Sequence, residues 1–187
     1  MEACLSLPVG ENHPIQPTLD PYGASKHHVE HYLHLYHVNF GLAYTILRYP
    51  NVYGPRQDPR GEAGVVAIFA GQMLARSQPV INGTGRQERD FVHVGDVARA
   101  SLLALDQGDN QIFNLGSGVG TSVVTIYELL AELTAFGQKP LHGPAKKGEV
   151  SRVFLNATKA EQGLGWQPKI SLRDGLASTV QFFRGAV

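Results

Sequence analysis

The segment Pro21-Tyr22-Gly23-Ala24-Ser25-Lys26 decides how the chain folds around it, because it opens the longest predicted helix. Asp20 is a typical N-cap residue and Pro21 suits the first helical position, so the pattern predicts a helix from there to about Asn39. Tyr22 and Lys26 are four residues apart and therefore lie one turn apart on the same face. An ammonium group beside a phenol favours the phenolate, so the two side chains form a candidate proton donor and acceptor.

Three histidines occupy the other side of this predicted helix. Tyr22 and Lys26 belong to a stripe that continues along the helix, whereas His27, His31 and His34 lie on the opposite face. Two of them could share a zinc ion, but no thiolate or carboxylate at ligand spacing completes a site. We therefore predict no metal centre and expect solvated or interface histidines, with metal binding as the alternative.

Composition excludes several classes of function. The chain has 187 residues, of which 43% are hydrophobic, so it can bury a core. Lys+Arg and Asp+Glu are equal at 16 each, which gives no single-sign field to attract nucleic acid or an anionic membrane. The single cysteine fits a reducing compartment, and residues 1–10 lack the pattern of a signal peptide. No apolar run approaches the roughly 20 residues that cross a bilayer, so we expect a cytoplasmic protein that binds neither nucleic acid nor membrane.

Helical and strand patterns alternate along the chain, which predicts an α/β fold with parallel strand pairing. Asp96 is expected to cap one helix, and the capping box Thr125-x-x-Glu128 to open the next. Ser171-x-x-Asp174 should open the last helix. The strands are expected at 42–49, 79–82, 90–94, 112–115 and 150–155, the helices at 21–39, 65–76, 97–105, 125–137, 158–164 and 171–184, and a loop at 50–56.

Five motifs occur in an order typical of one protein family. They are Pro21–Lys26, the loop Arg48-Tyr-Pro-Asn-Val-Tyr-Gly-Pro-Arg56, the segment 83–99 (GTGRQERDFVHVGDVAR), Phe113–Gly118 (FNLGSG), and Thr158-Lys-Ala with Leu164-Gly-Trp-x-Pro168. Together they cover nearly the whole chain from residue 21 onward. The chain resembles the extended short-chain dehydrogenase/reductase family, and within it the NAD-dependent epimerases and dehydratases, with UDP-glucose 4-epimerase-like enzymes as the nearest members.

The resemblance implies a role for each matching residue. Tyr22 would be the acid/base on the sugar hydroxyl, Lys26 would bind the nicotinamide ribose of NAD and support the phenolate, and Pro50 would lie near the nicotinamide. A UDP-sugar or related nucleotide-sugar would be the substrate. Its expected contacts are Asn51 on the nucleotide-sugar, Val80 and Asn82 on base and ribose, Arg89 on the diphosphate and Glu149 on the ribose. Lys146 stands where many relatives have an arginine and could serve the substrate as a point charge.

The family's Gly-rich phosphate turn, G-x-x-G-x-x-G, does not occur in this sequence. Gly116-Ser117-Gly118-Val119-Gly120 follows a strand and precedes a helix, but it lacks the spacing and the following βαβ unit, so we interpret it as an ordinary turn. The sequence therefore predicts the C-terminal part of a Rossmann-like parallel sheet plus the small nucleotide-sugar-binding lobe, with the N-terminal βαβ half missing.

The expected consequences concern domains, activity and assembly. Residues 1–56 and 91–120 would form the Rossmann-like remnant, and 57–90 and 121–187 the substrate-binding lobe, interleaved in one compact unit. We expect little or no 4-epimerase activity from the chain alone and doubtful NAD binding. There are two alternatives: a non-catalytic nucleotide-sugar-binding or assembly module, and a fragment of a nucleotide-sugar dehydratase or reductase. An open sheet edge or the 21–39 helix should mediate self-association.

Overall fold

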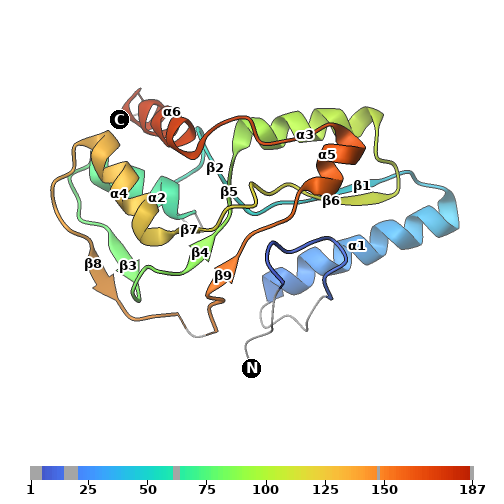
Figure 1. The fold of residues 1–187 in the computed structure, drawn as a ribbon, viewed down its shortest axis with the longest axis horizontal. Helices are drawn as coiled ribbons and strands as arrows, with labels where there is room; N and C mark the ends of the chain where they lie inside the picture. The colour runs from blue at the N-terminus through green and yellow to red at the C-terminus, as the bar shows by residue number, and fades with distance from the viewer. Residues whose placement is uncertain (1–5, 15–20, 61–63, 147, 186–187) are drawn as a thin grey trace.

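The computed structural model describes residues 6–14, 21–60, 64–146 and 148–185. Helices and strands alternate along this part of the chain (Figure 1). The helices are α1 (Pro21–Phe40), α2 (Val65–Leu74), α3 (Val94–Asp106), α4 (Val123–Thr134), α5 (Thr158–Leu164) and α6 (Leu172–Gly185). The strands are β1 (Thr45–Arg48), β2 (Asn51–Tyr53), β3 (Val80–Asn82), β4 (Glu88–Arg89), β5 (Phe91–His93), β6 (Gln111–Asn114), β7 (Thr121–Ser122), β8 (Leu141–Gly143) and β9 (Arg152–Val153).

Parallel pairing dominates the short sheets. β1 pairs with β6, β2 with β5, and β3 with β8, all in parallel, whereas β4 lies between antiparallel β7 and parallel β9. Figure 1 shows α3 and α5 on one side of the β1–β6 pair and α1 on the other. The predicted α/β fold with parallel strands is confirmed. None of the helices in the described ranges has the combination of length and apolar character needed to cross a membrane.

The apolar core has two clusters that meet at β5. The first lies among α2, α4 and α6, and includes Phe91 of β5. The second lies among α3, β6 and α5, and includes Val92 of β5 together with the fully buried Trp166. Successive side chains of a strand point to opposite faces, so β5 lies between the two clusters and contributes one side chain to each. The division of the chain into two interleaved domains stays a prediction; α5, which falls within 121–187, packs in the second cluster.

Three local predictions are wrong. The segment 50–56 is not all loop, because Asn51–Tyr53 forms β2 beside β5. Asp96 does not cap α3: His93 is the N-cap and accepts a hydrogen bond from the Gly95 N–H, while Asp96 is buried in the first turn. The box at Thr125 does not open α4 either, since Ser122 is the N-cap and accepts a hydrogen bond from the Thr125 N–H.

Helix α1 begins and ends close to where the sequence predicts, although Asp20, its expected cap, lies outside the described residues. None of its residues is buried. One link to the sheet is an ion pair in which Arg48 of β1 donates from Nε and Nη2 to the two carboxylate oxygens of Glu30, at 2.8 and 2.6 Å. Hydrogen bonding to Glu30, with its negative charge, outweighs the opposing effect of burial and raises the pKa of Arg48. This ion pair is therefore a main determinant of where α1 lies.

Candidate functional site

The predicted proton-transfer pair lies in the first two turns of α1. The Nζ atom of Lys26 is 5.1 Å from the centre of the Tyr22 ring, a separation at which an ammonium and an aromatic face attract each other. Tyr22 is 68% exposed. The predicted proximity of ammonium and phenol is thus present, and the helix spacing alone produces it.

Pro50 and Asn51 lie at the junction of β1 and β2. Asn51 is exposed, and its backbone N–H donates to the carbonyl of Asp90 at 3.0 Å. That bond fixes Asn51 next to the residue that follows Arg89 in the chain. The short strand β2 follows β1 in the chain and pairs with β5, so it lies beside the strand that follows Arg89.

The remaining predicted substrate residues come from β3, from β4 and from the segment that follows β8. Arg89 lies on β4, and its Nη2 contacts Oε1 of Glu149 at 3.2 Å, 60 residues further along the chain. Val80 and Asn82 lie on β3, which pairs with β8 just before the segment that carries Lys146. Val80 and Lys146 are exposed, and Asn82 is half-buried. The fold thus brings Arg89 into contact with Glu149, whose backbone N–H lies 3.5 Å from the Lys146 carbonyl.

The glycine-rich turn at 116–118 is filled from inside the molecule. The carboxylate of Asp90, which is 1% exposed, accepts hydrogen bonds from the N–H groups of Ser117 and Gly118 and from the Ser117 hydroxyl. The Leu155 N–H donates to the same carboxylate at 3.0 Å. The Asp90 carboxylate therefore already occupies these donors. The interpretation of this segment as an ordinary turn stays a prediction. Sequence reasoning missed Asp90, whose only signal was its place in the 83–99 motif.

The structure assembles some of the predicted residues and leaves others apart. Arg89 and Glu149 are in contact, and Asn51 is tied to their strand through Asp90. Among the described residues, no hydrogen bond or ion pair joins Tyr22 or Lys26 to this group. No cluster of three or more metal-ligating side chains occurs in the described ranges. The predicted site residues therefore fall into two separate groups in the structure, Tyr22 with Lys26 on α1 and Arg89 with Glu149.

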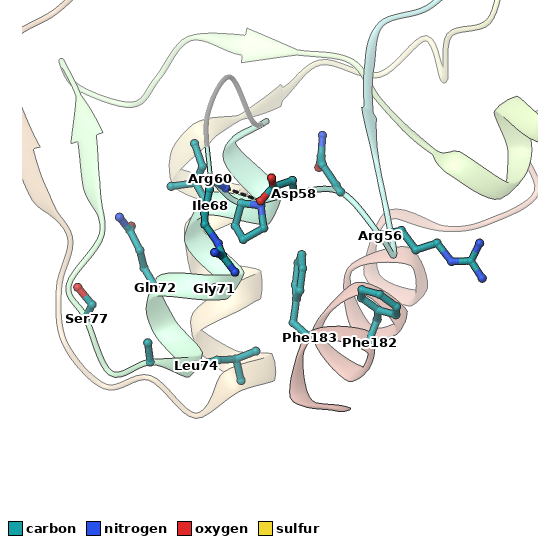
Figure 2. A pocket seen from close by; sticks show the side chains of 13 residues that line it. Arg56, Asp58, Arg60, Ile68, Gly71, Gln72, Leu74, Ser77, Phe182 and Phe183 are labelled. Carbon is teal, nitrogen blue, oxygen red and sulfur yellow. Dashed lines mark hydrogen bonds between the residues drawn. The ribbon is translucent and has the colours of Figure 1, made fainter. Parts of the chain in front are cut away.

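A hollow of about 730 Å³ lies elsewhere, between the 56–60 segment, α2 and the end of α6. Figure 2 shows Phe183 of α6 on one side of it and Ile68 and Gly71 of α2, together with Arg60, on the other. None of the predicted site residues lines it. We therefore assign neither substrate nor cofactor to this hollow, and nothing in the sequence signalled it.

Comparison with known families supplies the identity of the fold. Residues 5–116, more than half of the chain, match the model of the NAD dependent epimerase/dehydratase family. The chain belongs to this family. The resemblance inferred from the five motifs is confirmed.

Relatives within the NAD dependent epimerase/dehydratase family are close in sequence and structure. The chain is 48% identical over 178 residues to a putative UDP-glucose 4-epimerase of Methanocaldococcus jannaschii, covering 95% of this chain and 57% of the relative. The solved UDP-glucose 4-epimerase of Thermotoga maritima with UDP-glucose is 47% identical, with a TM-score of 0.96 over all of this chain and 60% of its own. A UDP-glucose 4-epimerase of Thermus thermophilus in complex with NAD is 40% identical, with a TM-score of 0.89 and the same coverages. The chain thus spans less than two thirds of the length of these relatives.

Proposed function

We propose that the chain is the part of a nucleotide-sugar 4-epimerase-like protein that binds the nucleotide-sugar and carries the Tyr22–Lys26 pair. The observation that carries the proposal is the charged group on the lobe, in which Arg89 is held by Glu149 at 3.2 Å. Arginine presents a planar fork of donors that matches a diphosphate. The Thermotoga maritima relative, 47% identical over this chain, was solved with UDP-glucose.

The proposed roles of the residues rest on the family resemblance, and the exposure of Tyr22 and its contact with Lys26 support them. The exposed Tyr22 hydroxyl would take the proton from the sugar C4 hydroxyl and return it, and Lys26 beside it would stabilise the phenolate. Arg89 would bind the diphosphate with Lys146, Asn51 would contact the nucleotide-sugar, and Val80, Asn82 and Glu149 would contact its nucleoside. NAD, when bound beside Tyr22, Lys26 and Pro50, would supply the hydride acceptor and donor.

The chain alone is proposed to be nearly inactive. The Gly-rich phosphate turn does not occur in its sequence, and Asp90 already occupies the 116–118 turn. We therefore expect NAD to bind weakly if at all. Robust interconversion of UDP-glucose and UDP-galactose by the purified chain with added NAD would refute this part of the proposal.

Calorimetric titration with UDP and UDP-glucose tests the retained binding function. We expect Arg89→Ala to weaken UDP binding about tenfold or more, the effect of losing charge-assisted hydrogen bonds worth ~1.5 kcal/mol or more. Arg89→Lys keeps the positive charge but not the planar guanidinium group, so its affinity for UDP should lie between those of the unmodified chain and of Arg89→Ala. Arg86→Ala is the matched control, because Arg86 is exposed on the same segment and should leave affinity unchanged. No binding of UDP or UDP-glucose at millimolar concentration would contradict the proposal.

A non-catalytic nucleotide-sugar-binding or assembly module is the second candidate. It is favoured by the exposed apolar side chains of α1, which include Val29, Tyr32, Tyr36 and Phe40. Within the described residues, β1 pairs only with β6, so its other edge is also open to a partner strand. We propose that α1 or this edge mediates self-association; a monodisperse monomer in light scattering would contradict it. A cytoplasmic location completes the proposal and rests on composition alone.

A further inference from the structure

Two histidines of α1 hold their ring nitrogens at the spacing of metal ligands. His27 and His31 are four residues apart, their ring centres are 4.6 Å apart, and their Nε2 atoms are 3.1 Å apart. With metal–nitrogen bonds of ~2.0–2.1 Å, two ligands on one metal ion have nitrogens about 2.8–3.4 Å apart for angles between 90° and 109°. The observed separation falls inside this range before any rotation of either ring.

The two rings are joined by a hydrogen bond between their Nε2 atoms. Two Nε2 atoms at 3.1 Å can form a hydrogen bond only if one is protonated and the other offers its lone pair. A metal ion can replace this proton, because neutral imidazoles then direct both lone pairs to the same point. The two rings already lie in contact on the helix, so binding an ion between them requires little change in their positions.

Neighbouring groups limit the site to these two side chains. His28 is the next nearest imidazole, but its ring centre is 6.2 and 6.5 Å from the other two, and its Nδ1 bonds the Ala24 carbonyl at 2.7 Å. Within the described ranges, no third metal-ligating side chain joins the pair. His31 is exposed, so water can fill the remaining positions around an ion.

The sequence around the pair has the order H-x-x-E-H, which one class of zinc hydrolases uses with the glutamate as a base. Here Glu30 is held by both donors of Arg48, at 2.8 and 2.6 Å. That carboxylate is therefore committed to the contact between α1 and β1. Glu30 could not serve a metal ion on the pair as a base without breaking the contact between α1 and β1.

We propose that His27 and His31 form a binding site for one divalent transition-metal ion, with water completing the coordination. Imidazole pairs bind late first-row ions in the order that peaks at Cu²⁺, and they bind the oxygen-preferring ions Mg²⁺ and Ca²⁺ poorly. The expected ligand class is therefore Cu²⁺, Ni²⁺ or Zn²⁺. The site is independent of the nucleotide-sugar function and does not require NAD.

The experiment is calorimetric titration of the tag-free chain with Zn²⁺, Ni²⁺ and Cu²⁺ salts, supported by histidine NMR spectra. We expect one equivalent of each ion to bind, Cu²⁺ most tightly, with the largest spectral changes at His27 and His31. His27→Ala and His31→Ala should each weaken binding at least about tenfold, the factor that corresponds to ~1.4 kcal/mol.

His34→Ala is the matched control, because His34 is an exposed histidine of the same helix and should leave affinity unchanged. Circular dichroism of each variant separates loss of the site from loss of α1. The proposal is overturned if the unmodified chain binds none of the three ions. It is also overturned if His34→Ala weakens binding as much as His31→Ala does.

Discussion

The ion pair between Arg48 and Glu30 allows a quantitative test of how α1 is held. We consider Arg48→Met, which removes the guanidinium but keeps most of the aliphatic stem. The variant loses both hydrogen bonds to Glu30 and the 3.1 Å bond from Nη1 to the Glu11 carbonyl. Since α1 has no buried residue, little apolar packing compensates for the loss.

The magnitude follows from the exposure of the pair. The side chains of Arg48 and Glu30 are 24% and 19% exposed, so the pair is only partly buried. Exposed ion pairs contribute ~0.2–1 kcal/mol to stability, and a hydrogen bond to a charged group contributes ~1.5–3 kcal/mol. The contribution of this pair should lie between these two cases. We therefore expect α1 to lose about 2 kcal/mol of stability against local opening, which corresponds to roughly 30-fold faster exchange of its amide hydrogens.

Hydrogen exchange followed by NMR or mass spectrometry measures this effect segment by segment. The amides of α1 should exchange faster, whereas those of α4, which packs in the first apolar cluster, should not change. The matched control is Arg173→Met. Arg173 contacts both oxygens of Glu132 at 3.0 and 2.5 Å, but the side chains are 55% and 59% exposed, so no measurable change is expected. Unchanged exchange in α1 of the Arg48 variant, or equal effects of the two variants, would refute the reasoning.

Two further predictions concern buried carboxylates. Burial alone raises the pKa of Asp96, but hydrogen bonds from Ile170, Arg99 and the backbone N–H of residue 169 outweigh it and hold the pKa below its usual value. Its stabilising contribution is therefore complete above the unfolded-state pKa of ~3.9 and is lost as pH falls through the lower folded-state pKa. In urea unfolding, the stability difference between the native chain and Asp96→Asn should narrow below that pH, and a constant difference would contradict this assignment. In Gly116→Ala, the new methyl group would lie 2.6 Å from the Asp90 carboxylate and from a neighbouring carbonyl, so we expect a loss of ~1–3 kcal/mol in the same assay. Gly137→Ala is the control because nothing lies within 4 Å of its added methyl group, and equal stability of the two variants would count against the proposed crowding.

Local signals in the sequence predicted those elements whose ends are fixed by nearby residues. The bounds of α5 agree with the prediction, and the end of α1 agrees to one residue because Gly41 follows it with a φ of 70°. Ser171 accepts a hydrogen bond from the Asp174 N–H at the start of α6, as its spacing indicated. Patterns of a few residues contain enough information for such ends.

Elements and contacts that depend on distant residues could not be predicted in this way. β2 is only Asn51–Tyr53, flanked by Pro50 and Gly54, and it exists because β5 pairs with it. Aspartate is a typical helix-capping residue, but the Asp96 carboxylate accepts hydrogen bonds from the backbone N–H groups of residues 169 and 170 instead. For the site, helix spacing placed Lys26 beside Tyr22, whereas the contact of Arg89 with Glu149 spans 60 residues and came only from family resemblance and the fold.

The position of β5 between the two apolar clusters also limits how this protein can vary in length. Phe91 points into one cluster and Val92 into the other, and Asp90 just before them fills the 116–118 turn. Because side chains alternate along a strand, one inserted or deleted residue here would exchange the faces of both clusters at once and move the carboxylate out of its turn. A substitution in this stretch changes the packing of one side chain only. An insertion or deletion of one residue changes the packing of all of them. Insertions and deletions among homologues should therefore avoid residues 90–93 even where the amino acids themselves differ.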